Sequence, residues 1–215
     1  SKHKSLGVTT VQCEDEIAGC SSALGASFAG ALGVTSTSGP GICLKSEAMN
    51  LAVIMELPLV VLDVQRGGPA TGLPTKSEQT DLLQVLFGRN GESPMPVIAA
   101  ISPVDCFDAA FQACKIALEH MTPVVLLSDA FVANGSAAFK LPNLDDYPAI
   151  NPPYVPVHGA GRGAALLLLR HDHSLVAADW RCVCYGRHLD LFFSGEHARS
   201  AFRPTTGCGQ CAGCH

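Results

Sequence analysis

Three short aliphatic runs, separated by segments of helical length, constrain the fold of this chain more than any other feature. They are PLVVLDV at Pro58 to Val64, MPVIAAI at Met95 to Ile101, and TPVVLLS at Thr122 to Ser128. Such runs are typical of strands buried on both faces of a parallel sheet. A shorter strand is expected at Val34 to Thr37. The alternation predicts an α/β fold with an open, mostly parallel sheet flanked by helices.

Four segments around these strands have the composition of helices. Asp15 to Leu32 is rich in small residues, and Cys43 to Met55 follows a loop that contains two glycines. Thr75-x-x-Glu78 matches a capping box, which predicts a helix from Thr75 to Phe87. The last helix is expected from Ser102 to about His120, because Ser, Pro and Asp favour a helix start.

Composition argues against several classes of protein. The net charge is -5 and the pI is near 5.8, which gives no electrostatic reason to expect nucleic acid or an anionic membrane as a partner. The aliphatic run AALLLL, from Ala164 to Leu169, is too short to cross a bilayer. The N-terminal SKHKSLGV lacks the apolar stretch of a secretion signal. We therefore expect a cytoplasmic protein with no membrane segment.

The chain changes character after about residue 140. We expect residues 1–140 to form the α/β domain, 141–156 to be a Pro-rich acidic linker, and 157–215 to be a poorly ordered, irregular tail. From Val157 onward there is no lysine, whereas six of the eight histidines and six of the eight arginines lie there. Such a break indicates a different module, a disordered extension, or a sequence that is not translated in its native frame.

The tail also holds five of the ten cysteines. Cys208-x-x-Cys211-x-x-Cys214 has the spacing of the first three ligands of a bacterial ferredoxin-type run, which needs a fourth cysteine before a proline. Cys182 and Cys184 could complete a site, but their spacing is not diagnostic of zinc or of a cluster. An incidental grouping is favoured and no metal ligand is predicted. A metal- or iron–sulfur-binding electron-transfer module is kept as an alternative.

The strongest candidate for a site is the loop that follows the strand Pro58 to Val64. Ligands bind beyond the carboxyl ends of the strands in open α/β sheets, and Arg66 stands there. Its guanidinium matches a carboxylate with two parallel hydrogen bonds, and Gly67 and Gly68 remove side chains that would obstruct a ligand. A carboxylate-bearing substrate is therefore favoured over a solvated surface arginine.

The loop Ser38-Gly39-Pro40-Gly41 lies at the same expected edge of the sheet. Together with Lys45 it is a near miss for a phosphate-binding P-loop, because Leu44 stands where that motif needs glycine. We reject a nucleoside triphosphate site. The helix that follows could still bind an anion or a polar ligand with its N-terminus, and a plain tight turn is equally compatible with these residues.

The acidic triplet Glu14-Asp15-Glu16 opens the first helix. Acidic residues in a first turn are favoured by the helix dipole, which is sufficient reason for them to be there. However, the helix behind them is rich in Ala, Gly and Ser, which allows another backbone or a planar ring to approach closely. One of the three carboxylates is therefore a candidate for burial.

Taken together, the segment from Gln12 to Gln84 resembles the α subunit of 2-oxoacid:ferredoxin oxidoreductases, and the 2-oxoglutarate type in particular. The resemblance lies in TSGPG, E-x-P and QRGGPxTGLPT, and it continues to TPVVLLSDAFVANGS. It implies a pyrimidine-type thiamine diphosphate-binding domain. It also implies an enzyme that oxidatively decarboxylates a 2-oxoacid, with 2-oxoglutarate favoured, forms an acyl-CoA and reduces ferredoxin.

The same resemblance implies roles for five residues. Glu16 would hydrogen-bond the pyrimidine N1′ of the cofactor and promote the imino tautomer that deprotonates the thiazolium C2. Gly39 and Gly41 would contact the cofactor, and Arg66 with Thr71 would bind the carboxylate of the 2-oxoacid. The diphosphate, Mg²⁺ and a 4Fe-4S cluster are expected on a partner β subunit.

The sequence departs from the family in three places. A Tyr-Pro-Ile-Thr-Pro type motif lies upstream of the acidic triplet in the family but not here, so the domain is expected to lack its first strand and helix. Ala70 stands where serine is common, and nothing from Val157 onward resembles the family. We therefore expect the chain to be inactive alone as this fragment, and a non-catalytic α/β remnant is a further alternative.

Overall fold

The computed structural model describes residues 4–153, 165–169 and 174–178. A parallel sheet of four strands, in the order β1-β2-β4-β3, forms the centre of the first of these ranges. The strands are β1 (Gly33–Thr37), β2 (Leu59–Gln65), β3 (Val97–Ala99) and β4 (Pro123–Asp129). The predicted α/β fold with an open parallel sheet is confirmed.

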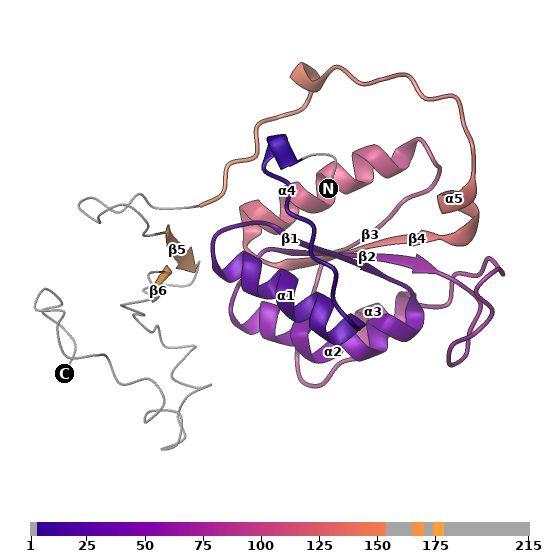
Figure 1. The fold of residues 1–215 in the computed structure, drawn as a ribbon, viewed down its shortest axis with the longest axis horizontal. Coiled ribbons are helices and arrows are strands. Elements are labelled where there is room, and N and C mark those ends of the chain that lie inside the picture. The colour runs from indigo at the N-terminus through magenta and orange to yellow at the C-terminus, as the bar shows by residue number, and fades with distance from the viewer. Residues whose placement is uncertain (1–3, 154–164, 170–173, 179–215) are drawn as a thin grey trace, which may run out of the picture.

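Helices cover both faces of the sheet, as Figure 1 shows. α1, α2 and α3 lie on one face and α4 lies on the other. The helices are α1 (Glu16–Phe28), α2 (Gly39–Ile54), α3 (Leu82–Phe87), α4 (Asp105–His120) and α5 (Ala130–Asn134), with 3-10 turns η1 (Lys4–Leu6) and η2 (Leu144–Asp146). In residues 4–153 none of these helices has the length and apolarity that a membrane span requires.

The alternation of side chains along the strands divides the core into two clusters. Val61 belongs to the cluster that α1 and α2 cover, and Val60 belongs to the cluster beneath α4. The small side chains Ala109 and Ala113 let α4 pack closely on its face of the sheet. By the same alternation, Asp63 shares the face of Val61, so a carboxylate enters the α1 and α2 side of the core.

The helix expected to begin at Thr75 is a wrong prediction in its first half, because α3 begins at Leu82. The preceding residues form a closed loop instead. The N–H of Gly67 donates to the carbonyl of Lys76 at 3.0 Å, and the N–H of Leu73 donates to the carbonyl of Gly67 at 2.7 Å. The first of these bonds uses the carbonyl of Lys76, which a helix starting at Thr75 would need in its first turn.

The second helix begins earlier than the sequence indicates. α2 starts at Gly39, four residues before Cys43, with the extended Ser38 as its N-cap residue. Proline in the first turn favours this start, because its missing N–H would have had no intrahelical partner there. The glycines of the SGPG segment therefore belong to the first turn of a long helix rather than to a separate loop.

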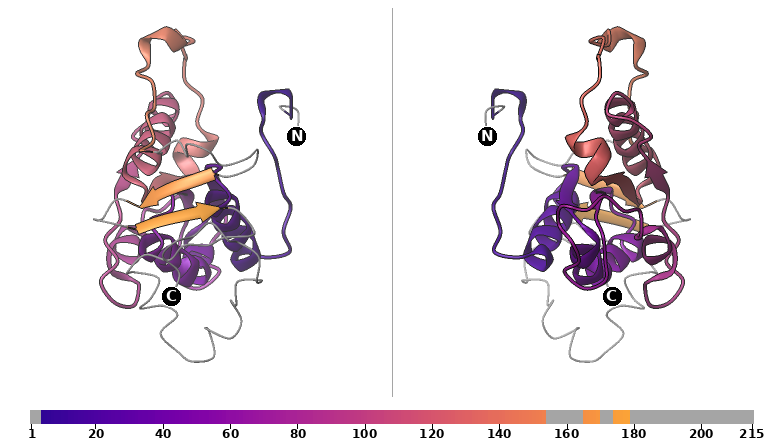
Figure 2. Two further views of the ribbon diagram at one scale, coloured as in Figure 1. Left: turned by 90° about the vertical axis from the view of Figure 1, so that its left-hand side faces the viewer. Right: turned by 90° about the vertical axis from the view of Figure 1, so that its right-hand side faces the viewer.

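The segment that follows α5 lies along α4. The ring of Tyr147 packs edge-on against Phe107 at 5.6 Å and Phe111 at 4.7 Å between ring centroids. Its hydroxyl donates to the carboxylate of Asp108. The predicted linker thus has a defined contact with the domain, while its boundaries stay a prediction. Figure 2 shows the residues before α1 as an extended arm beside the body, where Leu6 and two valines are exposed.

Two strands of the C-terminal part are described. β5 (Ala165–Leu169) and β6 (Ser174–Ala178) pair as an antiparallel hairpin, which the expectation of an irregular tail did not include. The five tail cysteines lie outside the described residues, so the alternative of a metal- or cluster-binding module stays a prediction.

Candidate active site

The parallel register brings the candidate segments to one edge of the sheet. At that edge Thr37 of β1 lies opposite Asp63 of β2, and Gln65 of β2 lies opposite Asp129 of β4. The first turn of α2 follows β1, and the loop of Arg66 follows β2. Two separately predicted segments therefore leave the sheet side by side, as expected for ligand sites in open α/β folds.

Glu16 and Gly41 are brought together across the α1–α2 contact. A Cβ atom on Gly41 would lie 2.9 Å from Cγ of Glu16 and 1.8 Å from Oγ1 of Thr37, so only glycine fits. The Glu16 side chain thus reaches over the first turn of α2. Glu16 itself is exposed, as are Glu14 and Asp15, so the candidate burial of one of these carboxylates is not found in this chain.

Gly39 is fixed from the opposite side by Asp81, the residue before α3. A Cβ atom on Gly39 would lie 2.6 and 2.8 Å from the two carboxylate oxygens of Asp81. The N–H of Asp81 donates to Oε1 of Gln65 at 3.0 Å, and the hydroxyl of Thr80 donates to its carboxylate at 3.1 Å. The first turn of α2 is therefore held between the side chain of Glu16 and this carboxylate.

Asp63 lies beneath the same turn and is fully buried, with 0% of its surface exposed. Burial, the negative charge of Asp81 and a hydrogen bond between the two carboxyl groups raise the pKa of Asp63 to about 7. As ionised groups, the two have no donor between them, and three of their four oxygens lack another partner in the described residues. A proton shared between Asp63 and Asp81 supplies the missing donor and pairs one oxygen of each carboxyl group.

A buried cation lies on α2 itself. Lys45 is 1% exposed, and its ammonium donates to Oγ1 of Thr35 at 2.6 Å and to the carbonyl of Ser36 at 3.2 Å. Burial lowers the pKa of Lys45, against the opposing charges of Cys20 and Glu16. Burial likewise raises the pKa of the Cys20 thiol, against Lys45. The lysine of the rejected P-loop thus points into the protein and not toward a phosphate.

Arg66 is the first residue after β2 and is half-buried. Its Nε atom is buried and has no hydrogen-bond partner among the described residues. Thr71 is exposed in the turn of the same loop, between Ala70 at φ 56° and Gly72 at φ 61°. A Cβ atom on Gly72 would lie 1.8 Å from the carbonyl oxygen of Gly67, so the turn requires glycine there.

Polar side chains anchor this loop to the sheet. Nε2 of Gln65 donates to the carbonyl of Ser128 at 3.2 Å, and Nε2 of Gln79 donates to the carboxylate of Asp129 at 2.6 Å. Burial would raise the pKa of Asp129, but hydrogen bonds from Gln79 and from two backbone amides of α5 outweigh it and lower the pKa. The loop that carries Arg66 is thereby fastened at both of its ends.

Three residues of this site were missed by the sequence interpretation: Lys45, Asp63 and Asp81. A signal existed for two of them. Lys45 is one helical turn after Gly41 and four residues before the buried Met49, so the 3.6-residue period places it on the buried face of α2. Asp63 interrupts a run of aliphatic residues that predicts burial on both faces. Asp81 has no comparable signal, because its loop was interpreted as helix.

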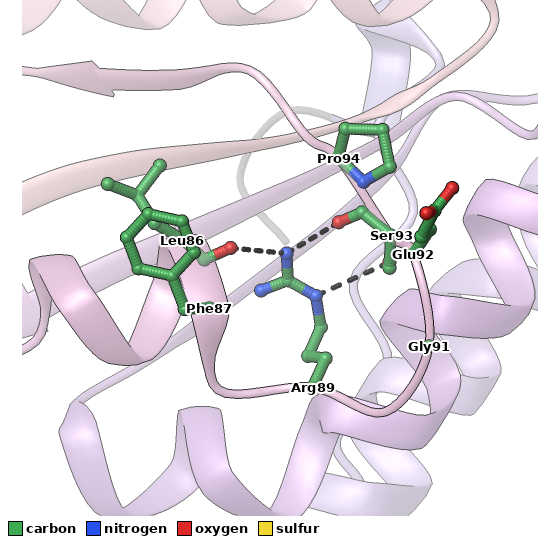
Figure 3. Close-up of a pocket in the computed structure, with 7 residues that line it drawn as sticks. All are labelled: Leu86, Phe87, Arg89, Gly91, Glu92, Ser93 and Pro94. Carbon is green, nitrogen blue, oxygen red and sulfur yellow. Dashed lines mark hydrogen bonds between the residues drawn. The ribbon is translucent and has the colours of Figure 1, made fainter.

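A depression of about 390 Å³ lies at the end of α3, away from these residues. As Figure 3 shows, the guanidinium of Arg89 donates to the carbonyl of Ser93 at 2.7 Å and to its hydroxyl at 3.4 Å. This cation is therefore used to hold its own loop. None of the predicted site residues lines the depression. In residues 4–153 there is also no group of three His, Cys, Asp or Glu side chains arranged to hold a metal ion.

Comparison with known proteins agrees with this geometry. The protein family described as "Pyruvate flavodoxin/ferredoxin oxidoreductase, thiamine diP-bdg" matches residues 2–172. The 2-oxoglutarate oxidoreductase subunit KorA of Mycobacterium tuberculosis is 62% identical over 150 residues, which are 70% of this chain and 23% of that protein. The 2-oxoglutarate synthase subunit KorA of Archaeoglobus fulgidus is 43% identical over 141 residues, or 66% of this chain and 41% of that protein.

A solved structure gives the same result. The 2-oxoglutarate:ferredoxin oxidoreductase from Magnetococcus marinus, with 2-oxoglutarate, coenzyme A and succinyl-CoA bound, is similar with a TM-score of 0.67 and 38% sequence identity. The similarity covers 79% of this chain and 29% of that one. The chain thus spans less than half the length of each of these relatives.

Proposed function

The chain belongs to the thiamine diphosphate-binding family of pyruvate flavodoxin/ferredoxin oxidoreductases, and on this premise we propose that it is the pyrimidine-binding part of an α subunit. The enzyme proposed is a 2-oxoacid:ferredoxin oxidoreductase. We favour 2-oxoglutarate as its substrate because a relative named as a 2-oxoglutarate oxidoreductase subunit is 62% identical over the matched residues. The observation that carries the proposal is the approach of the Glu16 side chain over Gly41.

The residues at this approach fit an aminopyrimidine ring. A planar ring needs a carboxylate at its edge and a surface without side chains at its face. Glu16 provides an exposed carboxylate, and Gly39 and Gly41, on either side of Pro40, provide backbone without side chains in the first turn of α2. Thiamine diphosphate, when bound, supplies the carbanion that attacks the keto carbon. Glu16 is assigned the hydrogen bond to N1′ of the pyrimidine, through which it controls the proton at that atom.

Arg66 and Thr71 are assigned to the carboxylate of the 2-oxoacid. The buried, unpartnered Nε of Arg66 is a donor that a carboxylate would satisfy, and the half-buried position strengthens a charge-assisted bond. Thr71 carries a hydroxyl on the exposed turn of the same loop and would add a further hydrogen bond. Because Gln65 and Gln79 anchor that loop, the arginine is held in position before substrate arrives.

The remaining parts of the reaction are assigned to a partner. The matched relatives are named as subunits, which supports a partner subunit. We propose that this partner is a β subunit that carries Mg²⁺ and a 4Fe-4S cluster. Ferredoxin and coenzyme A are then co-substrates of the complex. We place the domain at residues 1–140 and expect the complex in the cytoplasm.

The test is reconstitution of the chain with the β subunit of a 2-oxoglutarate oxidoreductase, thiamine diphosphate, Mg²⁺ and coenzyme A. 2-Oxoglutarate-dependent reduction of a dye is expected, or at least binding of thiamine diphosphate by calorimetry if the fragment does not turn over. Glu16→Gln should abolish turnover and weaken cofactor binding. Arg66→Ala should raise the KM for the 2-oxoacid while cofactor binding is kept.

Glu119→Gln serves as the matched control. It removes a carboxylate from α4 that pairs with Lys115 at 3.7 Å, on the other face of the sheet. Wild-type behaviour of the Glu16→Gln and Arg66→Ala variants would disprove the residue assignments, and failure of the wild-type complex to bind thiamine diphosphate would disprove the function.

A further inference from the structure

Two pairs of residues face each other where α1 meets α2. Glu16 and Cys20 are one turn apart on α1, and Gly41 and Lys45 are one turn apart on α2. The Cγ atom of Glu16 lies close to Gly41, and Lys45 interacts electrostatically with Glu16. The ammonium of Lys45 therefore lies one turn deeper in the protein than the carboxylate that is assigned to the cofactor.

The surroundings of Lys45 do not neutralise its charge. Its two hydrogen-bond acceptors, the hydroxyl of Thr35 and the carbonyl of Ser36, are uncharged, and they use two of its three N–H groups. No carboxylate in the described part of the chain lies within ion-pair distance of it. A lysine that is 1% exposed and lacks a counter-ion is costly to keep, since a methionine would fill the same space without a charge.

We propose that Lys45 is a positioning residue for Glu16, whose carboxylate it attracts toward Gly41, where the pyrimidine edge would bind. This inference rests on the proposed function. The groups that face Lys45 are Glu16 and Cys20 from α1 and the polar atoms of Thr35 and Ser36 from β1. Because the neutral form of a buried thiol is favoured, Glu16 is the anion on which the ammonium acts.

The first test needs only the full chain. Urea unfolding is measured at neutral pH and low salt for wild type, Lys45→Met, Glu16→Gln and the double variant. If the two charges interact, the change in the unfolding equilibrium constant of the double variant differs by about threefold from the product of the changes in the two single variants. Added salt reduces this difference. Lys115→Met, at a partly exposed lysine on α4, is the matched control and should combine with Glu16→Gln multiplicatively. Multiplicative effects of Lys45→Met would overturn the proposal.

The second test uses the complex with the β subunit, thiamine diphosphate and Mg²⁺. The near-ultraviolet circular dichroism of the iminopyrimidine tautomer is followed as a function of pH. In Lys45→Met the midpoint should move to higher pH by about one unit, because loss of a nearby cation favours protonated forms. Cofactor affinity should fall about tenfold. In the Glu16→Gln background, Lys45→Met should have no further effect on either quantity, since it acts through Glu16.

The outcomes separate the two proposals. A wild-type complex that binds no thiamine diphosphate disproves the proposed function, while the unfolding cycle still decides whether Lys45 acts on Glu16. A complex that binds the cofactor and depends on Glu16, but is unchanged by Lys45→Met, disproves the role of Lys45 alone. If Lys45→Met lowers cofactor affinity equally in the wild-type and the Glu16→Gln backgrounds, Lys45 has a general structural role and the proposal is wrong.

Discussion

Replacement of Asp63 by asparagine tests the shared proton beneath α2. The asparagine amide has the shape of the carboxyl group and can donate a hydrogen bond to Asp81 without any proton from solvent. Asp63 is fully buried, so the substitution changes protonation without changing solvent contact. It therefore fixes the pair in the state that wild type reaches only when Asp63 is protonated.

The sign and the size of the effect follow from the pKa of Asp63, which is raised from 3.8 to about 7 in the folded chain. Between these values the folded protein holds a proton that the unfolded chain has lost. The contribution of this group to the free energy of unfolding is thus complete below the unfolded pKa of 3.8. It is lost as the pH rises through the folded pKa of about 7, at about 1.4 kcal/mol per pH unit between the two values. Over the whole window this corresponds to about 4 kcal/mol.

The assay is urea unfolding, followed by circular dichroism, at intervals between about pH 5 and pH 8. The free energy of unfolding of Asp63→Asn minus that of wild type should increase by about 3 kcal/mol from the lowest to the highest pH, because only wild type loses the proton. Asp145→Asn, which removes an exposed aspartate from η2, should keep the wild-type slope. Parallel pH profiles of Asp63→Asn and wild type would refute the shared proton.

Three other substitutions test the packing of the domain. Gly41→Ala should cost about 1–3 kcal/mol in urea unfolding and weaken thiamine diphosphate binding, because its Cβ would collide with Thr37. Gly25→Ala, on the open face of α1 where a Cβ meets nothing, should instead stabilise the chain by about 0.5–1 kcal/mol. A loss of stability in Gly25→Ala, or no loss in Gly41→Ala, would contradict this packing. Tyr147→Ala should release the segment after α5 from α4 and speed its cleavage in limited proteolysis, whereas an unchanged rate would show that the contact does not protect it.

The strands were predictable because a strand buried on both faces has a continuous run of aliphatic residues in the sequence. The aliphatic run from Pro58 to Val64 became β2 with a shift of one residue at each end. The order β1-β2-β4-β3 was not predictable, since the runs resemble one another and no local signal states which of them are neighbours. The edge that carries Arg66 was predictable from chain direction alone, because all carboxyl ends of a parallel sheet meet there.

The loop before α3 shows where local patterns fail. Thr75-x-x-Glu78 satisfies the capping-box pattern, but Gly67 and Leu73 close a loop whose backbone bonds exclude a helix at that point. Tertiary contacts then decide the outcome, since Gln79 bonds to Asp129 on a strand that is distant in sequence. A pattern of four residues cannot contain that information.

The contacts of Asp81 link this loop to the predicted cofactor site. Its carboxylate lies against Gly39 on one side and bonds to Asp63 on the other, so a change in the charge of the pair acts directly on the first turn of α2. Glu16 presses on the same turn from α1, and Lys45 lies one turn below. Two buried ionisable groups, Asp63 and Lys45, thus lie near the start of α2. Because burial of such groups is costly, we propose that they set the geometry and charge at Glu16 and Gly39.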